Sequence, residues 1–433
     1  MLLQLGKFPT LVVQSADMAR EIMKTHDMNF INRPSVTASR EFLCDGKDIS
    51  FAPYGEHWRQ MRKLCTLDLL SSKRVQSFRS VREEEIGIMV DQIRNSSLSG
   101  KEVNLSELII AVTSNITTRV AWNRRLENSD HAELAKELMK LFGNTTIEDM
   151  FPSLKWVDAL TGVDGRMKKT SKEMKQFIND VIEEHLKARK DNHRESHTKD
   201  FIDLLLDYQE ESVLDDGADF TRDHIRGVIM NIFVAGTDTT YAALEWAMAE
   251  LVNHPNVMKK LQEEVRRVVA KKSVVDENEI SQMDYLNCVI KETLRLHPPL
   301  VFDLPRVATE SVTIDGYIIP AKTRVLINQW AIGRDPKMWE NPDEFIPERF
   351  VNNLIDFRGQ DFQFIPFGAG RRGCPGISFA TNSIETILVN LLYWFDWEIP
   401  GGEDKKSIDT SEDFGLSVIL KSPLCLVPIT HAV

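Results

Sequence analysis

Helical spacing of apolar residues dominates the chain. Most of residues 81–207 repeats apolar positions every three or four residues, with charged residues on the other faces. Residues 221–253 predict a long central helix, and its apolar positions cover more than one stripe, which favours burial on most sides. Two further helices are predicted at 285–297, ended by Pro298, and at 377–394.

Alternation of apolar and polar residues, which is typical of strands, is confined to short segments. It occurs in residues 2–14, in 307–328 and again after 398, where 415–418 predicts a hairpin tip. Residues 33–51 have mixed polarity without a period, which indicates an irregular loop at the surface or in contact with substrate. The patterns therefore predict mostly helices with a few short strands, and a length of 433 residues allows one large domain or two to three ordinary ones.

Composition excludes some classes of protein. The 433 residues carry a net charge of -12, which argues against nucleic-acid binding, because binding to phosphates requires a basic face. The five cysteines are scattered and odd in number, so they favour a reducing compartment over a disulfide framework. No segment approaches eighteen consecutive apolar residues, so the chain as written is not predicted to cross a membrane.

One stretch, residues 367–376, combines four glycines, two arginines, a proline and Cys374. Glycines allow a backbone to pass close to a flat or bulky ligand. The neighbouring arginines and amides should favour the thiolate form of Cys374. A thiolate is a soft ligand, and haem iron is one of the few cofactors that a single cysteine can hold. The alternative is a glycine loop with a buried, inert cysteine.

The middle of the predicted central helix, residues 235–240, contains one glycine, three threonines and an aspartate. These are poor helix formers, and buried hydroxyls tend to bond back to the preceding turn and bend the helix. Polar groups in an otherwise buried helix therefore predict a functional site.

Trp58 and Arg62 are four residues apart and share one face of a predicted helix. An indole N–H beside a guanidinium suits a carboxylate ligand, such as a haem propionate. An ordinary amphipathic helix with exposed basic residues is the alternative.

These patterns together resemble the cytochrome P-450 family, in particular its plant microsomal A-type branch, the seventy-one clan. The motifs are Trp-x-x-x-Arg at 58–62, the oxygen-activation motif at 235–240, Glu-x-x-Arg at 292–295, Pro-Glu-Arg-Phe at 347–350 and the haem-binding signature Phe-x-x-Gly-x-Arg-x-Cys-x-Gly at 367–376. Their order and spacing cover most of the chain. The resemblance implies a mainly α fold with small β-sheets, a single domain over residues 1–433, with haem between the central helix and the cysteine loop.

The resemblance also implies a role for each matching residue. Cys374 is the expected metal ligand of haem b, and the expected catalytic residues are Asp238, which delivers protons, Thr239, which hydrogen-bonds the oxygen, and Cys374 itself. The expected cofactor-binding residues are Trp58, Arg62, Arg306, Phe367, Gly370, Arg372 and Gly376. A structural triad is expected from Glu292, Arg295 and Arg349, and a substrate pocket from Ala235, Gly236, Val301, Phe302 and Leu416.

The implied activity inserts one oxygen atom from O2 into a small apolar plant specialised metabolite: a terpenoid, an alkaloid, a coumarin or another phenylpropanoid. Electrons are expected from NADPH through NADPH-cytochrome P-450 reductase, docked by Arg59, Lys63 and Arg371. Two alternatives stay open, a haem-thiolate isomerase or dehydratase and a truncated non-catalytic haem protein. The intact pair Asp238 and Thr239 argues against the first of these.

The resemblance also bears on localisation. Members of this branch carry an N-terminal anchor, a proline-rich hinge and a first helix before the opening strand, whereas this sequence starts at that strand. We therefore expect a truncated chain, with the full-length protein a monomer on the cytosolic face of the endoplasmic reticulum membrane.

Overall fold

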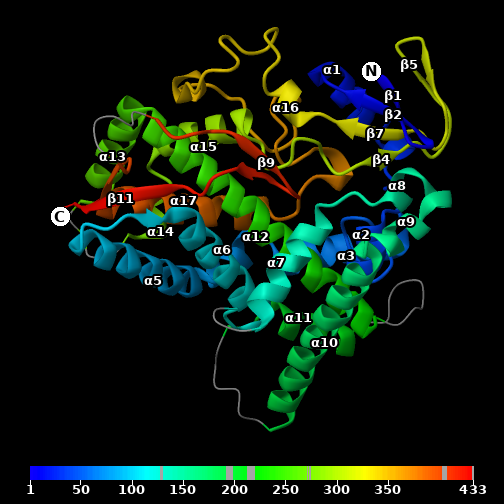
Figure 1. Cartoon of the computed structure of the whole chain (residues 1–433), viewed down its shortest axis with the longest axis horizontal. Coiled ribbons are helices and arrows are strands. Elements are labelled where there is room, and N and C mark those ends of the chain that lie inside the picture. Colours follow the sequence, from blue (N-terminus) through cyan, green and yellow to red (C-terminus); the bar gives the residue numbers. More distant parts are fainter. Residues whose placement is uncertain are drawn as a thin grey trace.

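The structure is a computed structural model, and it describes all residues except 127–129, 192–197, 212–219, 271, 273–274, 402–406 and 432–433. Helices make up most of it, as predicted (Figure 1). The helices are α1 Ala16–Arg20, α2 Thr37–Phe42, α3 Glu56–Leu64, α4 Ser72–Ser77, α5 Arg79–Leu98, α6 Leu105–Trp122, α7 Asp130–Phe142, α8 Ile147–Met150, α9 Trp156–Leu160, α10 Val163–Lys190, α11 Phe201–Glu211, α12 Arg222–Asn253, α13 Pro255–Val269, α14 Glu277–Ile280, α15 Asp284–Leu296, α16 Gln329–Ile332 and α17 Ile377–Trp394.

The strands are short and form small sheets. They are β1 Leu2–Leu5, β2 Phe8–Val13, β3 Val103–Asn104, β4 Arg306–Val307, β5 Val312–Ile314, β6 Tyr317–Ile319, β7 Arg324–Ile327, β8 Phe395–Glu398, β9 Glu412–Phe414, β10 Val418–Leu420 and β11 Cys425–Thr430. One sheet has the order β1-β2-β7-β4, with β2 and β7 parallel, and another has the order β3-β11-β8. The parallel pair joins the start of the chain to the segment after α15. The mainly α fold with small sheets is thus confirmed.

Helix α12 is the predicted central helix, and it runs through the middle of the molecule (Figure 1). Its start is fixed by Thr221, whose backbone N–H donates to Nδ1 of His224 at 2.8 Å. It packs against α6, α15 and α17, so its apolar residues are buried on several sides, as the sequence pattern predicted.

The cysteine loop is held by backbone contacts that only glycine permits. Gly370 has a φ of +69°, and a Cβ there would lie 2.4 Å from the carbonyl oxygen of Met23. The N–H of Cys374 donates to the carbonyl of Phe367 at 2.8 Å and closes the loop. Helix α17 begins directly after it, at Ile377.

The expectation of an irregular segment at 33–51 was wrong in part, because α2 lies within it. This short helix packs Phe42 into the core, where the side chain is 1% exposed, and the hydroxyl of Ser39 donates to the carbonyl of Val36 at 2.8 Å. Six residues are too few to show a helical period, so tertiary packing decides the conformation.

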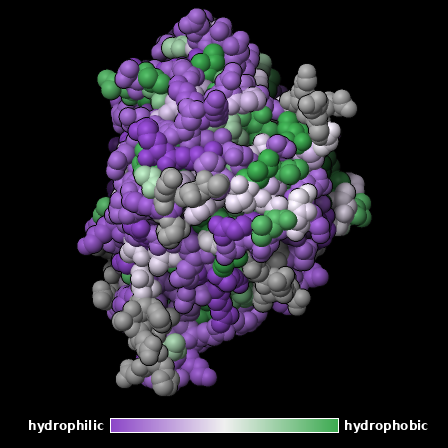
Figure 2. Space-filling model, turned by 90° about the vertical axis from the view of Figure 1, so that its left-hand side faces the viewer, coloured by the Kyte–Doolittle hydropathy of each residue, from purple (hydrophilic) through white to green (hydrophobic). Residues whose placement is uncertain are grey.

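None of the helices in the described part of the chain combines the length and the apolar character needed to cross a lipid bilayer. The side of the molecule on which β11 lies is mostly hydrophilic, with small separate hydrophobic groups (Figure 2). Several exposed large hydrophobic side chains lie instead between residues 147 and 160.

The predicted triad forms one buried network. Both oxygens of Glu292 accept from Arg295 within α15, at 2.7 and 2.8 Å, and Nε of Arg349 donates to Glu292 at 2.9 Å. Arg295 also donates to the carbonyls of Gly333 and Pro342, each at 2.7 Å. With Glu292 and Arg295 essentially inaccessible to solvent, the triad ties α15 to the segment 333–349.

Replacing Glu292 with alanine should therefore lower the free energy of unfolding by about 3–5 kcal/mol, because two buried guanidinium groups lose their partner. Asp91→Ala is the matched control, since Asp91 and Arg94 have the same spacing and a 2.7 Å contact on the surface. We expect the control to change stability by about 1 kcal/mol or less in denaturant unfolding. Equal losses in the two variants would contradict the structural role of the triad.

Candidate active site

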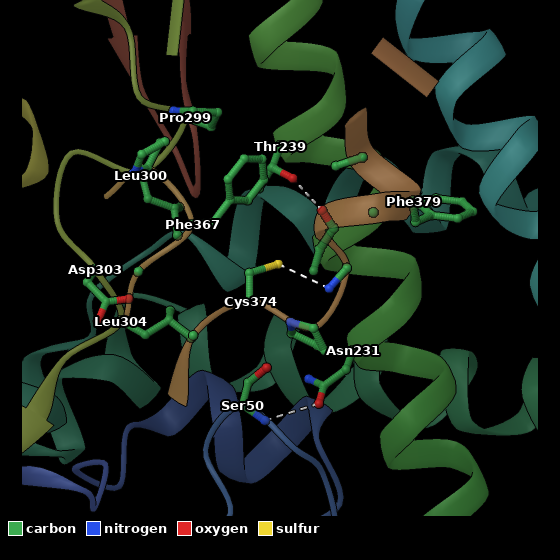
Figure 3. Close-up of a pocket in the computed structure, with 18 of the residues that line it drawn as sticks. Ser50, Asn231, Thr239, Pro299, Leu300, Asp303, Leu304, Phe367, Cys374 and Phe379 are labelled. Atoms are coloured by element: carbon green, nitrogen blue, oxygen red, sulfur yellow. Dashed lines mark hydrogen bonds between the residues drawn. The ribbon is translucent and has the colours of Figure 1, made fainter. Parts of the chain in front are cut away.

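A cavity lies between α12 and the cysteine loop, and Cys374 points its sulfur into it (Figure 3). Thr239 faces it from α12, with Pro299 and Leu300 on one side and Ser50 and Asn231 on another (Figure 3). Most of the lining is apolar, which suits an apolar ligand. The apolar lining includes Ile232, Ala243, Leu294, Pro299, Leu300, Leu304, Phe367, Phe379 and Ile384.

Cys374 is accessible from the cavity, while protein atoms surround it on its other sides. Burial raises the pKa of its thiol, opposed by the N–H of Gly376, which donates to Sγ at 3.3 Å, and by the charge of Arg62. The amide and the arginine favour the thiolate, and burial of the sulfur opposes them. A metal bound at the sulfur would displace the proton, because thiolate is the ligating form.

Charged residues on the cavity wall are Arg33, Arg62, Arg372 and Asp303, an excess of two positive charges. Among the described residues the guanidinium of Arg62 has no hydrogen bond or ion pair, and burial lowers its pKa. Burial also lowers the pKa of Arg33 to about 9 and that of Arg372 to about 10. Buried positive charge is costly without a partner, so this wall suits a ligand with two carboxylates.

Arg372 and Trp58 form a stacked pair at the edge of the cavity. The guanidinium lies 4.3 Å from the centre of the Trp58 ring and donates to the carbonyls of Ile31, Ile49 and Ala52. The indole N–H of Trp58 donates to the same Ile49 carbonyl at 2.9 Å. Trp58 is not among the residues that line the cavity, so its contact with a carboxylate ligand beside Arg62 stays a prediction.

Arg306 also lies behind the wall rather than on it. It is fully buried, 3.3 Å from Asp27 and 3.6 Å from Asp303 in two ion pairs. Arg33, rather than Arg306, lies on the cavity wall. Its Nε donates to the carbonyl of Ser50 at 3.3 Å, and its Nη1 lies 3.9 Å from a carboxylate oxygen of Asp303. Sequence reasoning missed Arg33 because Asp303 and the carbonyls of Leu304 and Pro305, which it also contacts, lie some 270 residues away, and no local pattern marks them.

On α12, Thr239 donates its hydroxyl to the carbonyl of Ala235 at 2.7 Å, the contact with the preceding turn that its position predicted. Asp238 points away from the cavity, and one carboxylate oxygen accepts from the N–H of Ser417 at 3.0 Å. Burial raises the pKa of Asp238, so this carboxyl group keeps a proton to higher pH than an exposed aspartate does.

The predicted substrate contacts separate into two groups. Ala235 and Gly236 line the cavity, whereas Val301, Phe302 and Leu416 do not. The carbonyl of Val301 accepts from the N–H of Gln329, Phe302 is partly exposed and pairs with Asn328 in an isolated bridge, and the backbone of Leu416 lies against Gly143.

Three predicted loop residues have distinct positions. Phe367 and Gly376 line the cavity, and a Cβ on Gly376 would lie 3.8 Å from the Cys374 sulfur. Gly370 lies outside the lining and instead allows the close approach to Met23.

The arrangement of a long helix facing a cysteine loop across a cavity is that of a haem-thiolate enzyme, and comparison identifies the class. Residues 1–426 match the cytochrome P-450 family, so the chain belongs to this family. It is a cytochrome P-450 monooxygenase, and a haem bound through a cysteine thiolate is the cofactor of such enzymes.

Several plant proteins, among them members of the seventy-one clan, are similar over nearly the whole chain. Cytochrome P-450 71A1 of Persea americana is 53% identical, over 99% of this chain and 86% of that protein. Phenylacetaldehyde oxime monooxygenase of Prunus mume is 46% identical, over 100% and 83%, and strychnine-11-hydroxylase of Strychnos nux-vomica is 43% identical, over 99% and 84%.

Among solved structures, a zebrafish cytochrome P-450 with progesterone superposes with a TM-score of 0.84 at 25% identity. The match covers 99% of this chain and 96% of the zebrafish chain. A second zebrafish structure, with abiraterone, has a TM-score of 0.81 at 23% identity and shows the shared fold alone.

Arg62→Leu should speed the transfer of haem from the purified protein to an acceptor apoprotein by about tenfold or more, because a charge-assisted contact is lost. Arg59→Leu is the control on the same helix, since Arg59 is exposed and pairs with Glu56. We expect the control to transfer haem at the wild-type rate. Equal rates for all three proteins would mean that Arg62 does not hold the cofactor.

Proposed function

We propose that the cavity binds haem b through Cys374 and that the enzyme inserts one oxygen atom from O2 into a small apolar plant specialised metabolite. The observation that carries this proposal is the wall of three arginines and one aspartate around a single cysteine. Its excess of two positive charges matches the two propionate carboxylates of haem. Arg33, Arg62 and Arg372 would hold these carboxylates, and Cys374 would hold the iron.

When bound, the haem supplies the activation of oxygen, which the electron-rich thiolate favours. The protein supplies position and protons. The Thr239 hydroxyl faces the cavity and can exchange its bond to Ala235 for one to a group in the cavity. Asp238, whose pKa burial raises, can carry a proton to this part of α12. These two groups favour the monooxygenase over an isomerase or dehydratase, which needs no proton delivery.

The apolar lining supports a terpenoid, alkaloid, coumarin or other phenylpropanoid as substrate, because few polar groups would have to be matched. Relatives are named for an aldoxime and for strychnine, which agrees with a small plant metabolite. The buried apolar residues form two clusters, one with members from Ala38 to Leu426 and a smaller one with members from Val13 to Ala369. Their members alternate along the sequence, which supports a single catalytic domain over residues 1–433.

We also infer contact with the cytosolic face of the endoplasmic reticulum membrane. Phe151, Leu154, Trp156 and Leu160 are exposed within ten residues, and Leu160 is 77% accessible. Exposed apolar groups of this density favour a lipid or protein surface, and tryptophan suits the membrane interface.

Cys374→Ser should abolish the carbon-monoxide difference spectrum of a thiolate-ligated haem and turnover with NADPH and reductase together, because serine is a poor iron ligand. Cys288→Ser is the control, since Cys288 is also a free cysteine but is buried in α15 away from the cavity. We expect the control to keep both. Turnover that survived in Cys374→Ser would refute the proposed function.

Reductase docking is proposed at the exposed basic residues Arg59 and Lys63 of α3 and Arg371 of the loop. Arg371 pairs with the buried Asp27 at 2.7 Å, whereas the partner of Arg59 is the more accessible Glu56, so substitutions in α3 disturb the fold less. Arg59→Glu with Lys63→Glu should slow the first electron transfer from reductase about tenfold at low salt, measured by stopped flow. The carbon-monoxide spectrum should not change.

Lys169→Glu, on the exposed surface of α10, is the control for a general charge effect. It should leave the rate of reduction unchanged. Slowing by the same factor in both proteins would point to overall charge rather than to a docking surface on α3.

A further inference from the structure

An aromatic pair lies behind the cavity wall formed by Pro299 and Leu300. The indole of Trp246, in α12, and the imidazole of His297, at the end of α15, stack with ring centres 3.9 Å apart and planes 3° apart. The side chains are nearly inaccessible to solvent, and neither residue lines the cavity. The pair therefore joins α12 to the segment that supplies Pro299 and Leu300, two and three residues after His297.

Glu250 fixes the imidazole of His297 in its plane. Nε2 of His297 lies 2.6 Å from one oxygen of Glu250, and the other oxygen lies 3.2 Å from Nδ1 of His254. Burial lowers the pKa of His297, so the neutral ring donates from Nε2. Nδ1 of His297 has no hydrogen-bond partner among the described residues, and a proton placed there would be unsatisfied.

Trp246 also holds the hairpin of β9 and β10. Its indole N–H donates to the carbonyl of Val418 at 2.9 Å, and the N–H of Val418 donates to the carbonyl of Pro299 at 2.9 Å. The contacts form a closed ring that passes from Trp246 to Val418, to Pro299, to His297 and back to Trp246. A closed ring of buried contacts restricts each member more than a single hydrogen bond does.

Two carboxylates of α12 hold the same hairpin. Asp238 accepts from the N–H of Ser417 at 3.0 Å, and Glu245 accepts from the N–H of Leu420 at 2.9 Å. Together with Trp246 they attach the hairpin along two turns of the helix that carries Thr239. The position of the Pro299 wall relative to Thr239 thus depends on this helix face.

We infer that Trp246 and His297 are positioning residues that set the distance between α12 and the Pro299–Leu300 wall, and thereby the size of substrate that the cavity accepts. The inference rests on the proposed function, which makes this cavity the substrate site. Trp246 and His297 would influence which substrates bind without touching them, because they position the Pro299–Leu300 wall.

Trp246→Phe tests the inference in the haem-loaded enzyme, because phenylalanine keeps a ring for stacking but lacks the N–H donor. The probes are imidazole and the larger 1-phenylimidazole, each titrated by the shift of the haem absorbance. We expect the affinity for imidazole to stay within about twofold of wild type. The affinity for 1-phenylimidazole should change by about five- to tenfold, the effect of one buried hydrogen bond on the shape of the site.

Trp122→Phe is the matched control. Trp122 is a tryptophan of α6 that is 1% exposed, and its indole N–H has no partner among the described residues, so the substitution removes no hydrogen bond. It should leave the ratio of the two affinities unchanged. His297→Phe, which keeps the stacking but loses the bond to Glu250, should alter the ratio as Trp246→Phe does. An unchanged ratio in both variants overturns the inference.

Amide hydrogen exchange separates this inference from the proposed function. Trp246→Phe should speed exchange at residues 417–420 by about tenfold, and Trp122→Phe should not. Unchanged exchange at these amides would overturn the positioning role whatever ligand the cavity holds. A wild-type protein without the spectrum of a thiolate-ligated haem would overturn the proposed function instead.

Discussion

Three arginines face one cysteine across the cavity, and the segments around the cavity have to accommodate this positive charge. Arg33, Arg62 and Arg372 line a cavity whose other walls are mostly apolar, and the pKa values of all three are lowered by burial. Arg372 is stabilised by three carbonyls from residues 31–52, whereas Arg62 has no such partner among the described residues. The partners of Arg372 stabilise the wall in the folded protein, while the charge of Arg62 stays available to attract a dianionic ligand.

Helix α12 serves both the cavity and the fold. Residues 235–240 leave space and supply hydroxyl groups at the cavity. They remain helical, and the hydroxyl of Thr239 donates to the carbonyl of Ala235 in the preceding turn. A little further along, Glu245 and Trp246 bind the C-terminal hairpin. The same helix thereby relates the reacting side of the cavity to the wall that contacts the substrate.

Sequence patterns predicted the long helices and the cysteine loop, because these rest on local spacing. The Glu292 triad was implied by the family resemblance alone, because Arg349 lies 57 residues from Glu292. Sequence patterns carry no such information where a side chain's environment comes from distant segments. Trp58 and Arg306 have the residue types for a ligand wall, but neighbouring carbonyls and carboxylates hold them behind it. Cys374 has the neighbours that favour a thiolate, yet burial outweighs them and raises its pKa.

The sequence by itself determined the class of protein: the order of its motifs, the single cysteine among glycines and the polar interruption of a buried helix. Only the tertiary structure decided which charged groups face the cavity and which side chains stand behind its wall. Arg33 meets the carbonyl of Pro305, and Trp246 meets Val418, across more than 150 residues of chain. Side-chain periodicity records the faces of single elements, and it holds no information about which faces meet.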